Sequence, residues 1–201
     1  VVFVGLVWTE AFGFLGFGDS VSWREEVLLH DGRKIIVERS QSYGGRHEIG
    51  QSAPIKEQNI TFAVPGTNKK ITWTSEYSKD VGRANFELLA LHIVKDVPFI
   101  VTTPRLCLSY NKWGRPNPPY VVFKYHNSEW QRIPFEELPA EFIALNLTIE
   151  TKSFEKELVS EKVVSAEKVK TLNGRLRQPE YKSILREALD VEQIACKEMI
   201  R

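Results

Sequence analysis

Apolar and polar residues alternate with a period of two over much of residues 22–149. This alternation is typical of antiparallel strands that bury one face. Four turn signals separate paired runs: Asp31-Gly32, Pro65-Gly66-Thr67-Asn68, Lys95-Asp96 and Asn127-Ser128. Paired runs around short turns read as hairpins, so the pattern predicts about eight antiparallel strands in a meander or a two-sheet sandwich. We assign residues 19–150 to this β domain.

The pattern changes at residue 151, where Glu, Lys, Val and Ala become frequent. Ser165 is suited to cap a helix that ends at Gly174, and Pro179 is suited to begin a second helix. The apolar stripe from Tyr181 to Ala195 has helical spacing. Residues 151–201 are therefore predicted to be a helical extension that packs on the β domain, which gives an α+β fold, mainly β. The run ELLALHIV is apolar on both faces, and we expect these helices to cover its second face.

The N-terminal segment 1–18 is almost entirely apolar. Of residues 1–17, fifteen are apolar or Gly, and only Thr9 and Glu10 are polar. Eighteen helical residues span ~27 Å, close to the ~30 Å hydrocarbon core of a bilayer. The favoured interpretation is a helical membrane anchor outside the β core, although an acid such as Glu10 is costly in a bilayer. A remnant of a secretory signal, a buried element of the fold and a segment that packs on a neighbouring subunit are the alternatives.

Composition and charge exclude several classes of protein. The chain has 27 Lys and Arg against 26 Asp and Glu, so no overall field favours nucleic acid, and no nucleic-acid partner is expected. With 42% hydrophobic and 26% charged residues, neither wholesale disorder nor a multi-span membrane protein fits. No G-x-S-x-G, H-E-x-x-H or Walker motif occurs. We therefore assign no catalytic residue and expect no cofactor and no metal.

The only two cysteines are Cys107 and Cys196. Their spacing is unlike that of a zinc ribbon. In an exported domain they are candidates for a disulfide, whereas in a cytoplasmic protein they would be two buried free thiols. The cell envelope is the favoured location and the cytoplasm is the alternative.

Residues 104–120 form the stretch whose composition most favours a binding segment. No acidic residue occurs in residues 97–128, which contain four basic residues and several aromatic ones. Prolines at positions 116, 118 and 119 stiffen the expected loop and lower the entropy cost of presenting side chains. The candidate binding residues are Tyr110, Lys112, Trp113, Arg115 and Tyr120. In the competing interpretation, Trp113 folds back onto the core and the loop only closes the sandwich.

These observations favour a non-enzymatic envelope domain, membrane-anchored or exported, that binds a protein partner through residues 104–120. A hydrolytic enzyme acting on an envelope polymer is one alternative, with acids drawn from Asp31, Glu48 and Glu136. A structural subunit of a phage-like assembly is the other, with the N-terminal segment packed on a neighbour.

Overall fold

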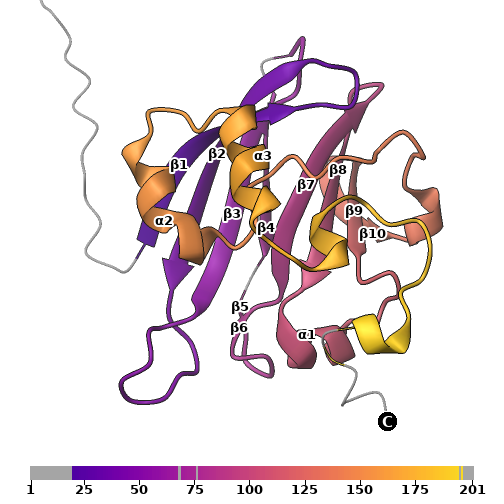
Figure 1. The fold of residues 1–201 in the computed structure, drawn as a ribbon. Coiled ribbons are helices and arrows are strands. Elements are labelled where there is room, and N and C mark those ends of the chain that lie inside the picture. The colour runs from indigo at the N-terminus through magenta and orange to yellow at the C-terminus, as the bar shows by residue number, and fades with distance from the viewer. Residues whose placement is uncertain (1–19, 68, 76, 195, 197–201) are drawn as a thin grey trace, which may run out of the picture.

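The computed structural model describes residues 20–67, 69–75, 77–194 and 196, and the predicted anchor at residues 1–18 lies outside them. The described chain is mainly β, with antiparallel sheets and three α-helices (Figure 1). The α+β class predicted from the sequence is therefore confirmed. In the described residues no helix has both the length and the apolar character needed to cross a membrane.

Two four-stranded antiparallel meanders form the body of the protein (Figure 1). The first sheet contains, in spatial order, β1 (Ser20–Leu28), β2 (Lys34–Tyr43), β3 (Ile55–Ala63) and β4 (Lys70–Ser75). The second sheet contains β7 (Phe86–Val94), β8 (Val97–Pro104), β9 (Val121–His126) and β10 (Glu129–Ile133). A small hairpin made of β5 (Tyr77–Ser78) and β6 (Arg83–Ala84) connects β4 to β7. The four hairpins predicted from the turn signals are all present.

Both meanders begin at the same end of the body. The Ser75 hydroxyl at the end of β4 accepts a hydrogen bond from the Phe86 amide at the start of β7 (2.9 Å). Because neighbouring strands are antiparallel, this end also carries the start of β1 at Ser20, the β2–β3 loop and the segment after β8. We call it the loop end. The opposite end, which carries the four short hairpin turns, is the turn end.

The main core lies between the two sheets. Its buried members come from the inner faces of both and include Val27, Val37, Ile60, Trp73, Phe86, Leu91 and Ile100. On one side, the Trp130 indole of β10 donates to the Thr72 carbonyl of β4 (2.7 Å). On the other side, the Asn146 side chain donates to the Leu28 carbonyl of β1 and to the Leu91 carbonyl of β7. Side-chain hydrogen bonds therefore connect the sheets along both seams.

One part of the inner face of the first sheet is polar. Glu25 and Arg39 form an ion pair with a nitrogen–oxygen distance of 2.9 Å, and both side chains are buried. The Arg39 guanidinium also donates to the Thr148 carbonyl (3.0 Å), and the Trp23 indole donates to Glu25 (3.0 Å). This buried pair fastens the chain that leads into α2 to the first sheet.

The helices α2 (Thr151–Ser160) and α3 (Ala166–Gly174) pack against β1, where Phe154, Leu158 and Leu172 surround Trp23. The predicted cap is confirmed, because the Ser165 hydroxyl accepts from the Lys168 amide (3.2 Å). The sequence predicted that the helices cover the outer face of the second sheet, and this prediction is wrong. Irregular chain does so instead, through Leu138, Phe142, Ile149 and Ile184.

The prediction of a helix from Pro179 to Ala195 is wrong. The described part of this stretch contains only two short 3-10 helices, η2 (Pro179–Tyr181) and η3 (Val191–Gln193), and a third, η1 (Phe135–Glu137), follows β10. Amides that a helix would use internally donate to distant groups. The Ile184 amide donates to the Ile143 carbonyl and the Leu185 amide to the Tyr120 hydroxyl. Tertiary hydrogen bonds therefore override the helical pattern.

Candidate functional site

The stretch singled out for binding lies at the loop end, and part of it is a helix rather than a loop. Residues Leu106–Lys112 form α1 directly after β8. Helix α1 has no side-chain cap at its first turn and is held from its inner side, where the Ser109 hydroxyl donates to the Asn85 carbonyl. Gly114, with φ of +88°, follows the helix and lets the chain turn away.

Two of the five predicted binding residues are buried. Tyr110 packs with Ile194 and Cys196, and Tyr120 belongs to the cluster on the outer face of the second sheet. The Tyr120 hydroxyl contacts the Glu180 and Ser183 carbonyls, and burial raises its pKa to about 12. Tyr110 and Tyr120 are therefore packed within the fold, and their contact with a partner stays a prediction. Both rings anchor the C-terminal segment.

Trp113 lies at the border between core and surface. Its half-buried ring packs on Phe86, with centroids 4.6 Å apart, and its indole nitrogen donates to the Asn85 side chain (3.2 Å). The Arg132 guanidinium lies 5.5 Å from the centroid of the same ring, at cation–π distance. Arg132, on β10, was not predicted. It lies outside the acid-free stretch of sequence, and only the pairing of β9 with β10 brings it here.

The positive charges of the stretch have different surroundings. Arg105 forms an ion pair with buried Glu87 in the interior, and Lys124 lies over the Phe99 ring. Lys112 pairs with Asp80 (3.0 Å), and this hydrogen bond, helped by one from Ser78, lowers the pKa of the Asp80 carboxyl to about 2. Two of the four basic residues in the acid-free stretch 97–128 are therefore used in ion pairs within the protein.

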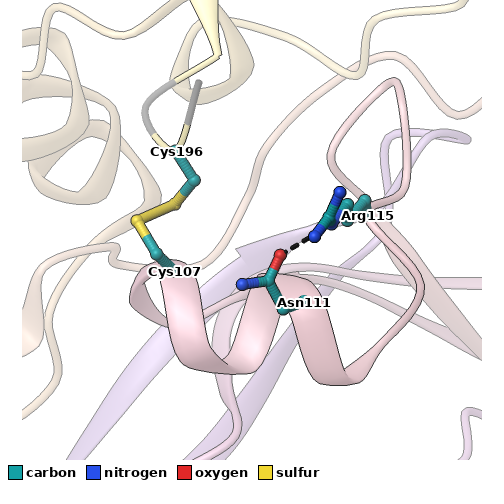
Figure 2. The surroundings of a disulfide bond; sticks show 4 residues. All are labelled: Cys107, Asn111, Arg115 and Cys196. Carbon is teal, nitrogen blue, oxygen red and sulfur yellow. Dashed lines mark hydrogen bonds between the residues drawn. A yellow bond between two sulfur atoms is a disulfide. The ribbon is translucent and has the colours of Figure 1, made fainter. Parts of the chain in front are cut away.

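Arg115 and Arg132 are the exposed cations beside Trp113. The Arg115 side chain donates through Nε to the Asn111 amide oxygen (2.8 Å; Figure 2). Arg132 donates to the Trp113 carbonyl (3.4 Å). Within the described part of the chain, neither guanidinium forms an ion pair with a carboxylate. Both therefore keep donors that a partner's carboxylate can accept from.

A disulfide between Cys107 and Cys196 fastens the C-terminal segment beside α1, with Cα atoms 5.3 Å apart (Figure 2). A second attachment lies nearby, where the Asn117 side chain donates to the Leu189 carbonyl (2.9 Å) and accepts from the Leu189 amide (2.7 Å). These two links place Cys196 and Ile194 over Tyr110. The surface around α1 is therefore built from three distant parts of the sequence.

Two grooves lie at this end. One, of about 430 Å³, runs beside Arg132 and is lined by Pro116, Pro118, Pro134 and Phe135. The other, of about 960 Å³, separates α2 from the start of β1 and is lined by Val21, Tyr43, Ala53 and Phe154. Lys152 spans its rim by donating to the Ser52 hydroxyl (3.0 Å) and to the Ala53 carbonyl.

The three acids considered for hydrolysis lie on different segments of the chain. Asp31 lies in the β1–β2 turn at the turn end and pairs with Arg33, whereas Glu48 lies in the β2–β3 loop at the loop end. Glu136 lies in η1, after β10. Among the residues that the structure describes, no three His, Cys, Asp or Glu side chains are grouped to hold a metal ion.

Comparisons with known proteins give no match: no family model fits the chain, and neither curated proteins nor solved structures are significantly similar to it. The function must therefore be argued from the geometry.

Proposed function

We propose that this chain is a non-enzymatic domain of the cell envelope, exported or membrane-anchored through residues 1–18, that binds a protein partner. The binding surface is formed by Lys112, Trp113, Arg115 and Arg132, and we call it the Trp113 surface. The disulfide supports the location, because such bonds persist in oxidising compartments and are rare in the cytosol. The apolar composition of residues 1–18 supports an anchor.

The contact between Arg132 and the half-buried Trp113 ring carries the proposal. Trp and Arg dominate the residues that supply most of the binding energy at protein interfaces. Here the indole is held by Phe86 and Asn85, so little side-chain entropy is lost on binding. The exposed Arg132 lies beside the indole and the exposed Arg115 follows it in the chain, and neither forms an ion pair within the described residues. This suits a partner segment that presents an acidic side chain beside an apolar one.

The partner can be captured by photo-crosslinking. Benzoylphenylalanine in place of Trp113 should form a crosslink in cells, whereas the same substitution at Arg24 should not. Arg24 is exposed on the outer face of the first sheet, far from α1. A crosslink of equal yield from both positions would indicate unspecific contact.

With the captured partner purified, Arg132→Ala and Arg115→Ala should each weaken binding about 30-fold, or ~2 kcal/mol. Both side chains are exposed, so the midpoint of unfolding should stay unchanged, and Arg24→Ala is the matched control. Unchanged affinity in both variants would refute the Trp113 surface as the binding site.

A further inference from the structure

The loop end brings together the start of the described chain and an exposed apolar side chain. Ser20, which is separated from the apolar N-terminal segment by one residue, pairs with Ser42 near the end of β2. The β2–β3 loop, residues 44–54, begins two residues later and projects from the body next to this point (Figure 1). Ser20, Ser52 and Ala53 line the same groove. The chain therefore enters the body beside this loop.

The tip of the loop carries Ile49, which is fully exposed, more so than any other large apolar side chain in the described residues. Burial of such a side chain is favourable, so an apolar environment outside the fold would stabilise the exposed Ile49. Exposed loops held by a fixed scaffold are common places for binding residues.

The base of the loop is fixed. The Gly44 amide donates to the Pro54 carbonyl (3.0 Å), and the Arg46 amide donates to the Gly82 carbonyl of the β5–β6 hairpin (2.9 Å). Gly45 approaches this hairpin so closely that a Cβ atom would lie 2.4 Å from the Gly82 oxygen. Gly45 also has φ of +94°, so two independent constraints require glycine there. Ile49 thus projects from a rigid support.

The same end carries further apolar and basic side chains. Leu106 and Leu108, which flank Cys107 in α1, are 61% and 51% exposed. The exposed cations Arg46 and Lys79 accompany Ile49, and the Arg46 guanidinium donates to the Lys79 carbonyl (3.3 Å). Exposed aliphatic side chains next to Lys and Arg are the composition with which proteins contact anionic membrane surfaces.

We propose that the loop end lies against the surface of an anionic bilayer, with Ile49 inserted at the level of the lipid headgroups. This inference rests on the part of the proposed function that places the chain at a membrane, and it goes beyond it by orienting the body. Attachment of residues 1–18 at Ser20 brings the Ile49 loop to the bilayer at high effective concentration, so a weak contact suffices. Glu48 and Asp80 also lie at this end, and Asp80 is neutralised by Lys112.

The experiment uses the full chain with one added cysteine that carries an environment-sensitive fluorophore. Cys107 and Cys196 are joined, so a single new thiol can be labelled selectively. Ile49→Cys reports on the loop end. Leu28→Cys is the matched control, since Leu28 is an exposed aliphatic residue at the turn end of β1. Each protein is mixed with phosphatidylcholine vesicles with and without about one third phosphatidylglycerol.

We expect the Ile49 label to shift to the blue and to brighten about twofold on the anionic vesicles, and less on the neutral ones. Lipids that carry a quencher should quench it, and the Leu28 label should not respond. Equal responses of the two labels, or none at Ile49, overturn the proposal. A response at Ile49 only after the captured protein partner is added assigns the loop to that protein and overturns the membrane contact.

The outcome is independent of the Trp113 surface. Arg132→Ala, which should lose partner binding, should leave the vesicle response of the Ile49 label within about 20% of the parent if the two contacts are separate. Failure of the Trp113 surface and failure of the membrane contact are therefore distinguishable.

Discussion

The two sheets have the same topology and are buried in different ways. In the first sheet, β1 alternates between inward and outward side chains, and the outer face stays in solvent. Short polar side chains bond to one another there, as between the Thr61 and Thr72 hydroxyls (2.8 Å). In the second sheet, β7 is buried over eight of its nine residues. The first sheet is an outer layer, and the second is enclosed between the main core and the irregular C-terminal chain.

This difference shows where the protein can carry function. A strand buried on both faces is fixed by packing and leaves no side chain for a partner. The exposed face of the first sheet is mostly polar, and some of its side chains form hydrogen bonds with one another. The side chains that can reach a partner lie at the loop end, on segments that the two sheets hold in place.

The largest expected effect is on the cover of the second sheet. Phe142→Ala should lower the free energy of unfolding by about 4 kcal/mol, because Phe142 is fully buried and stacks on His92 (centroids 4.5 Å apart). Ile36→Ala, on the outer face of the first sheet, should cost less than about 1 kcal/mol. Urea unfolding with a shared slope measures both. Similar losses in both variants would contradict the difference in burial between the outer faces of the two sheets.

The next largest effect on stability is expected at the buried ion pair of the first sheet. Arg39→Met leaves Glu25 buried without its partner and should lower the free energy of unfolding by about 3 kcal/mol. Arg24→Met is the matched control. It removes the same type of charge from the opposite face of the same strand pair and should change stability by less than about 0.5 kcal/mol. If the two variants unfold alike, the buried pair does not fasten the chain before α2 to the first sheet.

A smaller effect depends on pH and arises in the second sheet. Burial lowers the pKa of His92 to about 4, whereas its ordinary value is 6.5. The unfolded chain therefore binds a proton that the folded chain excludes, so stability falls as the pH drops below 6.5 and the loss is complete near pH 4. Between pH 7.5 and pH 5 this amounts to about 2 kcal/mol.

The control for this prediction is His92→Gln. The glutamine amide can still donate to the Ala144 carbonyl, which His92 contacts at 2.9 Å, but it does not titrate. The variant should lose most of the pH dependence in this window. A parent whose stability is flat between pH 7.5 and pH 5 would contradict the neutral buried state of His92.

Features that depend on neighbouring residues could be predicted from the sequence. The Asp31-Gly32 and Asn127-Ser128 turns follow from local backbone preferences, and both join the strands that the alternation indicated. The Ser165 cap is equally local. The continuous apolar run of β7 indicated that both faces are covered, but it carried no information about which segment covers them.

The candidate site could be predicted only in part. Lys112, Trp113 and Arg115 lie together after β8, as the spacing implied, whereas Tyr110 and Tyr120 turn inward. An aromatic residue in a basic stretch can lie at the surface or in the core, because the composition of the stretch does not indicate which way each side chain points. Arg132 joins the site only through strand pairing, and no local signal marks it.

The sequence by itself determined the hairpins, their turns, the start of α3 and the presence of helices after residue 150, because each depends on interactions between residues a few positions apart. Only the tertiary structure decided that residues 179–194 form no long helix, that irregular chain covers β7, and that Trp113 meets Arg132. These outcomes depend on contacts across tens of residues. There, side-chain hydrogen bonds such as those of Tyr120 and Asn117 outweigh the modest helical preference of the local sequence.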